Sequence, residues 1–94
     1  MNSRVNASTS DRVFETAAEL FSLLSAPIRL RIVCELNNGE RNVSDLRERV
    51  GSSQPNLSQH LGMLYRGGVL GRRRVGSQIF YRVVSERVLL LYDA

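Results

Sequence analysis

The chain has 94 residues, 43% of them hydrophobic, which predicts one small folded domain rather than several domains or a disordered segment. It contains no run of about 18 apolar residues, which excludes a transmembrane helix, and its one cysteine excludes an intramolecular disulfide and a thiolate metal cluster. The formal net charge is +4, and all 13 basic residues are arginine. This charge fits a nucleic-acid partner, because guanidinium groups bind phosphates and base edges bidentately. The absence of lysine also has a plain explanation in a GC-rich genome, whose codons favour arginine.

The first ten residues, MNSRVNASTS, are polar and lack the apolar centre of a signal peptide, so we expect a flexible tail (residues 1–10) and a cytoplasmic protein. Residues 11–94 are expected to form the domain, beginning with a helix over residues 11–24 that Ser10 or Asp11 caps. One face of this helix collects Val13, Phe14, Ala17, Ala18, Phe21 and Leu24. Leu20 and Leu23 widen the apolar surface beyond one stripe. A small domain has little core with which to bury both sides, so this helix is expected to meet a partner.

Residues 27–36 predict a second helix. Pro27 suits its first turn, and Leu30, Val33 and Leu36 are expected to face inward. The Asn-Asn-Gly sequence at residues 37–39 ends this helix.

A helix-turn-helix pair is predicted over residues 42–66. Asn42 is expected to begin its first helix, and Asp45 resembles the reciprocal partner of a capping box. Gly51 ends that helix after residue 50. The second helix covers residues 54–66, because Pro55 is tolerated only in a first helical turn and a Gly-Gly pair follows residue 66.

The stretch SQPNLSQHLGMLYRGG (residues 53–68) combines helical spacing with an unusual surface. Leu57, Leu61 and Leu64 recur at i, i+4 and i+7, which makes one apolar stripe. Most of the remaining surface consists of side chains that hydrogen-bond without a formal charge, namely Gln54, Asn56, Ser58, Gln59 and His60. Such side chains offer donors and acceptors for specific recognition.

A β-hairpin is predicted over residues 69–84, with Gly-Ser as a two-residue type II′ turn. Alternation places Arg73, Gln78 and Arg82 on one face, which we take as the solvent or DNA side. Arg72 is the wing arginine expected to have a structural partner, and Arg74, near the turn, is expected to reach phosphate. Residues 85–92 predict a short final helix capped by Ser85, whose three adjacent leucines indicate another partner surface.

A helix-turn-helix followed by a hairpin is the winged-helix plan, so the fold class is α+β, mostly α, with a two-stranded wing. In this plan the second helix of the pair enters the DNA major groove. Gln and Asn bind adenine bidentately, and Ser pairs with several base edges. The predicted DNA-binding residues are Gln54, Asn56, Ser58, Gln59, His60, Arg73, Arg74 and Gln78.

Each of these assignments has an alternative. The amides serve equally as a solvated surface, and the arginines as a strand edge that resists aggregation. Ser58 lies beside the leucine stripe and can instead brace the turn, while His60 can pack on the turn rather than touch a phosphate.

No constellation typical of an enzyme is present. There is no Gly-rich phosphate loop, no Cys/His ligand cluster and no spaced carboxylate pair. We therefore expect no catalytic residue, no metal and no cofactor.

SQPNLSQHLGMLYRGGVL, followed by RRRVGSQIFYRV and preceded by APIRLRIVCEL, resembles the ArsR family of bacterial winged-helix repressors over residues 13–88. The resemblance implies a homodimer built by the first and last helices, which binds a near-palindromic operator and releases it when an inducer binds. Many members sense metals through a C-V-C-D-L motif. Here the matching residues read NVSDL, so Asn42 and Ser44 replace the thiolates and soft-metal binding at that site is lost. A second family site uses Asp and His pairs on the last helix, and SERVLLLYDA contains no histidine.

Within the family the chain is most similar to the sulfur-responsive, biofilm-growth-associated repressor branch. Cys34 matches the cysteine that this branch carries on its second helix, but the branch's second cysteine is missing, which excludes an intramolecular switch. Modification of Cys34 alone, a bridge between two chains, a role as a small buried hydrophobic residue and loss of the sensor all remain open.

We therefore expect a homodimeric repressor that binds a palindromic operator, with recognition helices about 34 Å apart. A redox or reactive-sulfur signal at Cys34 is expected to release it. The alternatives are a winged-helix module that binds proteins, and a repressor that has lost its inducer site.

Overall fold

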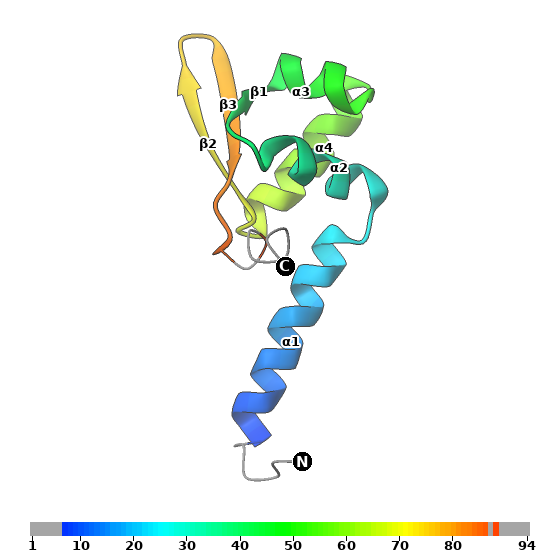
Figure 1. Ribbon diagram of the computed structural model, residues 1–94, viewed down its shortest axis with the longest axis vertical. Helices are drawn as coiled ribbons and strands as arrows, with labels where there is room; N and C mark the ends of the chain where they lie inside the picture. The colour runs from blue at the N-terminus through cyan, green and yellow to red at the C-terminus, as the bar shows by residue number, and fades with distance from the viewer. Residues whose placement is uncertain (1–6, 87, 89–94) are drawn as a thin grey trace.

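The computed structural model describes residues 7–86 and 88, which form helices and a small sheet (Figure 1). The elements are α1 (Ala7–Leu24), α2 (Pro27–Leu36), β1 (Arg41–Asn42), α3 (Val43–Val50), α4 (Gln54–Arg66), β2 (Leu70–Val75) and β3 (Gln78–Val83). The predicted helix over residues 85–92 lies mostly outside the described residues. At its start, within the described residues, the Val88 N–H donates a 3.5 Å hydrogen bond to Ser85 Oγ.

Helix α1 begins at Ala7, four residues before the predicted start, and extends away from the rest of the domain (Figure 1). Only its last turns meet the core: Leu24 is buried, and Leu20 and Leu23 pack beside it. Val13 and Phe14 remain 60% and 72% exposed. The structure therefore identifies the side of α1 that the domain leaves uncovered.

Helix α2 buries Ile32, Val33 and Leu36, whereas Leu30 is 45% exposed, so the inward prediction for Leu30 was wrong. Ile32 and Leu36, four residues apart, lie on the buried side of α2. Leu30 is two positions from Ile32 and therefore points to the other side of the helix. Cys34 is exposed on that other side for the same reason. The buried, purely hydrophobic role considered for Cys34 is therefore wrong.

The helix-turn-helix forms as predicted over α3 and α4. Asn42 Oδ1 accepts a 2.8 Å hydrogen bond from the Asp45 N–H, so Asn42, the residue just before α3, is the N-cap of this helix. The Asp45 carboxylate accepts bonds from Arg41 and Arg49 instead of completing a capping box. Gly51 ends α3 with φ +73°, in the left-handed region that favours glycine.

The wing belongs to a three-stranded antiparallel sheet in the order β1-β3-β2, so the prediction of two strands was incomplete. Strand β1 pairs Arg41 with Tyr81 and has only two residues, which is too short to show an alternating pattern. At the other end of the wing, Gly76 has φ +61° and Ser77 does not have positive φ, which excludes type I′ and fits the predicted type II′ turn.

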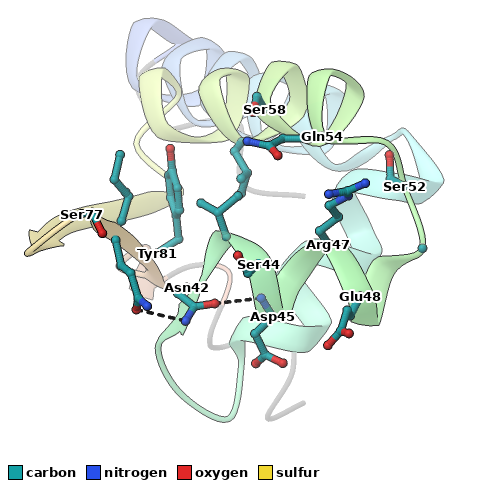
Figure 2. Close-up of a pocket in the computed structure, with 15 residues that line it drawn as sticks. Asn42, Ser44, Asp45, Arg47, Glu48, Ser52, Gln54, Ser58, Ser77 and Tyr81 are labelled. Carbon is teal, nitrogen blue, oxygen red and sulfur yellow. Dashed lines mark hydrogen bonds between the residues drawn. The ribbon is translucent and has the colours of Figure 1, made fainter.

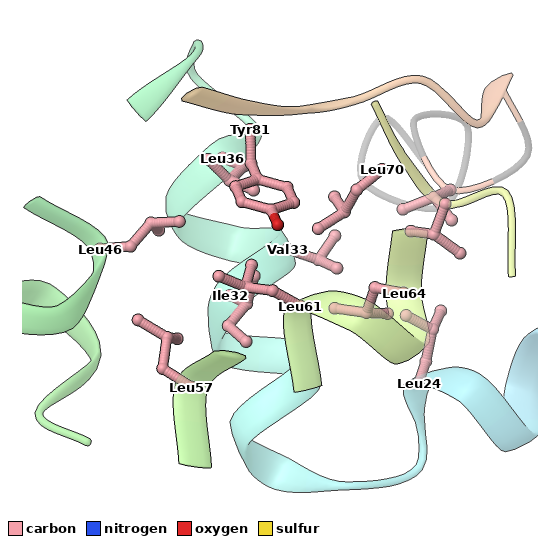
Figure 3. Packing of buried hydrophobic residues seen from close by; sticks show 12 residues of the cluster. Leu24, Ile32, Val33, Leu36, Leu46, Leu57, Leu61, Leu64, Leu70 and Tyr81 are labelled. Carbon is pink, nitrogen blue, oxygen red and sulfur yellow. The ribbon is translucent and has the colours of Figure 1, made fainter. Parts of the chain in front are cut away.

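The core lies between the helices and the inner face of the sheet (Figure 3). Helix α4 contributes its leucine stripe, and the sheet contributes Leu70 and Tyr81. The buried residues are Leu24, Ile32, Val33, Leu36, Leu46, Leu57, Leu61, Leu64, Val69, Leu70, Tyr81 and Val88. The core thus fixes which faces of α4 and of the wing remain open.

Candidate nucleic-acid interface

A polar groove of about 1030 Å³ separates the helix-turn-helix from the wing (Figure 2). We call it the wing groove. Helix α3 lines one side, the first turns of α4 another, and strand β3 with its turn the third. Its polar lining includes Ser44, Arg47, Glu48, Gln54, Ser58, Ser77 and Gln78.

The uncharged side chains of α4 divide between two flanks. Gln54 and Ser58, four residues apart, both line the wing groove. Asn56 lies on the other flank, where its Nδ2 donates a 3.0 Å hydrogen bond to Ser52 Oγ beside a smaller hollow of about 460 Å³. Gln59 is exposed and lines neither hollow. The structure therefore brings Gln54 and Ser58 together with the wing, but not Asn56.

His60 packs between helices. Arg29 Nη1 lies 3.1 Å from His60 Nδ1, and since an arginine can only donate, Nδ1 accepts this bond and the ring proton is assigned to Nε2. The same guanidinium donates to the Leu23 carbonyl at the end of α1 and lies 3.5 Å from Met63 Sδ on α4. The packing role considered for His60 thus has a specific partner, and the Nε2–H group remains as a donor.

Arg72 has the structural partner that we expected. Its guanidinium carbon lies 4.0 Å from the ring centre of Tyr65 on α4. A hydrogen bond with Tyr81 is the main cause that raises the pKa of Arg72 above its usual range. Arg72 therefore connects strand β2 to the C-terminal half of α4.

Arg73 is also paired, which the sequence did not indicate. Its Nε and Nη2 donate to the two carboxylate oxygens of Glu40 at 2.8 and 2.7 Å. The hydrogen bond from Arg73 is the largest effect on Glu40 and lowers its pKa, while the charge of Arg82 lowers it further. Glu40 immediately precedes β1, so the unpredicted strand is what brings this carboxylate to the wing.

Arg74 differs from its two neighbours. It is exposed, and it makes no hydrogen bond or ion pair with another residue that the structure describes. It lies opposite Ile79, on the sheet face that also carries Arg72 and Tyr81. Because Ile79 and Tyr81 line the wing groove, this is the face toward the groove. Arg73 lies opposite Phe80 and so shares the other face with Gln78 and Arg82, as alternation predicted.

Gln78 directly follows the turn of the wing, and its Oε1 accepts a 3.3 Å hydrogen bond from Asn42 Nδ2. Over residues 7–86 and 88, no three His, Cys, Asp or Glu side chains gather closely enough to hold a metal ion. No helix within that part of the chain is both long and apolar enough to cross a membrane.

Known proteins resemble this chain in sequence. The model of the bacterial regulatory protein arsR family matches residues 26–70, from just before α2 to the start of β2. The Biofilm growth-associated repressor of Xylella fastidiosa (strain Temecula1 / ATCC 700964) is 43% identical over 77 residues, which are 82% of this chain and 68% of that protein.

Solved structures agree with this match. The transcriptional repressor BigR from Xylella fastidiosa superposes with a TM-score of 0.85 at 36% identity, over 95% of this chain and 91% of that one. Reduced HlyU from Vibrio cholerae N16961 gives 0.87 at 30% identity, over 90% of both chains. The homodimeric winged helix-turn-helix DNA-binding domain of Mb0332 from Mycobacterium bovis (fragment 1–100) superposes with a TM-score of 0.79 at 27% identity, over 99% of this chain and 84% of that one. The chain therefore belongs to the ArsR family of bacterial regulatory proteins and has a winged helix-turn-helix fold.

Proposed function

We propose that this protein is a transcriptional repressor, not an enzyme, which binds a palindromic operator as a homodimer. The observation that carries the proposal is the wing groove: uncharged hydrogen-bonding side chains of α4 line it, and the sheet face that borders it also carries Arg74, which is unpaired among the described residues. A protein with this task acts on chromosomal DNA, so we place it in the cytoplasm.

Helix α4 is the element that reads the major groove. Its buried leucine stripe holds it on the domain, which leaves Gln54, Ser58 and Gln59 on the outward half. Gln and Ser side chains distinguish bases by their donors and acceptors. We assign Asn56 and His60, on the flank toward α2, to the sugar-phosphate backbone, where the Nε2–H of His60 is a suitable donor.

The wing supplies contacts that do not depend on base sequence. Arg74 is exposed and unpaired within the described part of the chain, so it can bind a phosphate without leaving another partner. Gln78, which follows the turn on the other face of the sheet, also lines the wing groove. Arg73 makes a second, weaker contribution, because it has to leave Glu40 before it binds DNA.

Helix α1 carries the surface for a second copy. Val13, Phe14 and Phe21 are 60%, 72% and 59% exposed on a helix that extends from the domain (Figure 1). A dimer would present two α4 helices about 34 Å apart, one turn of DNA, which corresponds to a palindromic operator. The homodimeric Mb0332 domain has the same fold.

Selection from a pool of random duplexes at near-physiological salt tests the proposal. Enrichment of one inverted repeat, together with a complex of two chains per duplex in analytical ultracentrifugation, is expected. Failure to enrich any sequence would instead favour a winged-helix module that binds proteins.

We further propose that oxidation or persulfide formation at Cys34 releases the operator. Cys34 is exposed on α2, on the side that also carries the exposed Leu30. Mass spectrometry after treatment with peroxide or a polysulfide donor, with operator binding measured on the same sample, is the test. Unchanged affinity at full modification removes Cys34 as a sensor and leaves a repressor that has lost its inducer site.

A further inference from the structure

We infer that the wing groove binds one sugar-phosphate strand of the operator, and that Arg47 of α3 supplies its cationic phosphate contact. The inference rests on the proposed DNA binding. When α4 lies in the major groove and the wing reaches the neighbouring minor groove, the strand that separates the two grooves of DNA must pass between them. The wing groove lies at that position.

Arg47 is available for such a contact. Its side chain is exposed and makes no hydrogen bond or ion pair with the part of the chain that the structure describes. Figure 2 shows its guanidinium turned toward Gln54 and Ser52, at the start of α4. In helix-turn-helix proteins the first helix of the pair crosses the DNA backbone, which makes a phosphate the natural ligand of an α3 arginine.

Arg49, two residues further along the same helix, is the structural counterpart. Its Nε lies 3.1 Å from Asp45 Oδ1, and its Nη1 lies 3.6 Å from Glu35 Oε2. Asp45 is also paired with Arg41 at 2.9 Å. One arginine of α3 thus stabilises the domain, while the other, beside the groove, has no partner in the part of the chain that the structure describes.

The rest of the lining fits a phosphodiester strand. Hydroxyl groups of Ser44, Ser58 and Ser77 border the groove and can donate to phosphate oxygens. The Asp45 carboxylate carries its charge in ion pairs with two arginines, which lower its pKa. Glu48 is the remaining acidic residue in the lining, and its carboxylate points away from α4 in Figure 2.

The test compares Arg47→Gln with Arg49→Gln in the full chain, on the selected operator and on a random duplex, over a series of salt concentrations. Each variant removes one positive charge from the same helix. For Arg47→Gln we expect weaker binding to both duplexes and a log–log salt slope that is smaller by about one for each protomer. Arg49→Gln should keep the wild-type slope, and Arg47→Lys should restore most of it.

Equal salt slopes for the Arg47→Gln and Arg49→Gln proteins would overturn the inference. So would an Arg47→Gln protein with altered sequence preference, because that result would indicate a base contact. Circular dichroism and thermal melting establish that both variants are folded. If the wild-type protein selects no sequence, the proposed function fails, whereas the inference fails alone when selection is normal and Arg47→Gln changes nothing.

Discussion

Helix α4 and the wing border the same groove, but they divide their side chains in different ways. In α4 the division follows helical spacing: Leu57 and Leu61 are buried, while Gln54 and Ser58 open into the groove. In the wing, three consecutive arginines have three different surroundings. Arg72 lies on Tyr65, Arg73 is bound by Glu40, and Arg74 has no partner among the described residues. In α4, periodicity therefore identifies the role of a residue, whereas in the wing the role of a charged residue depends on distant parts of the chain.

The largest effect is expected where packing is removed from α4. Leu61→Ala should lower the free energy of unfolding by about 2–5 kcal/mol, because it deletes a buried side chain and leaves a cavity. Urea denaturation measures this loss. Gln59→Ala on the exposed side should change stability by less than about 0.5 kcal/mol. Similar losses for the two variants would contradict the division of α4 into a packing side and a reading side.

A smaller effect, on specificity, is expected from the reading side. Gln59→Ala should reduce discrimination between the preferred base and its competitors by about 1–3 kcal/mol, while non-specific binding stays unchanged. Competition binding with single-base operator variants measures this difference. Asn56→Ala is the matched comparison: Asn56 is bonded to Ser52 on the opposite flank and is assigned to the sugar-phosphate backbone, so its loss should lower affinity for every sequence alike and leave discrimination unchanged. Equal losses on operator and random DNA for Gln59→Ala would remove its assigned role.

The wing comparison predicts a difference between neighbouring arginines. Arg74→Ala should weaken binding to every sequence and reduce the log–log salt slope by about one for each protomer. Arg73→Ala should have a smaller effect, because the Arg73 guanidinium is already held by Glu40 on the other face of the sheet. A greater loss for Arg73→Ala in filter-binding titrations would show that Glu40 positions Arg73 for DNA instead of withholding it.

The smallest effect concerns protonation of Glu40. Its folded pKa is lowered from the ordinary value of 4.5, chiefly by the hydrogen bond from Arg73. Because the pKa is lowered in the folded protein, the pair stabilises the fold at pH values above the ordinary pKa of Glu40. This stabilisation disappears as the pH falls through the lowered pKa of the folded state. Carboxyl NMR should therefore give a midpoint below 4.5. In Arg73→Gln the midpoint should move upward, and an unchanged midpoint would disprove the role of Arg73.

Much of the fold follows from local sequence patterns. The spacing of Leu57, Leu61 and Leu64 predicted the buried side of α4, and alternation predicted which wing residues share a face. Strand β1 was missed because two residues have no period. Its consequence, the Glu40–Arg73 pair, was missed with it, since those residues are 33 positions apart.

Other features that the sequence did not predict also depend on residues far apart in the chain. Leu30 is apolar, yet the position of the core on the Ile32 side of α2 leaves it exposed. For the site, composition alone suggested Gln54 and Ser58, and the structure adds that they face the wing. Arg47 gave no local signal, because an unpaired arginine is recognised only when the partners of the other arginines are known.

The guanidinium of Arg29 joins three helices: it comes from α2, binds carbonyl oxygen at the end of α1, and contacts His60 and Met63 on α4. In the proposed dimer, α1 carries the partner and α4 carries the reading surface. The direction of α1 relative to α4 would therefore set the span between the two reading helices, and Arg29 is one of the residues that hold this direction. In the proposed dimer we expect Arg29 to influence, through this angle, the length of operator that the protein accepts.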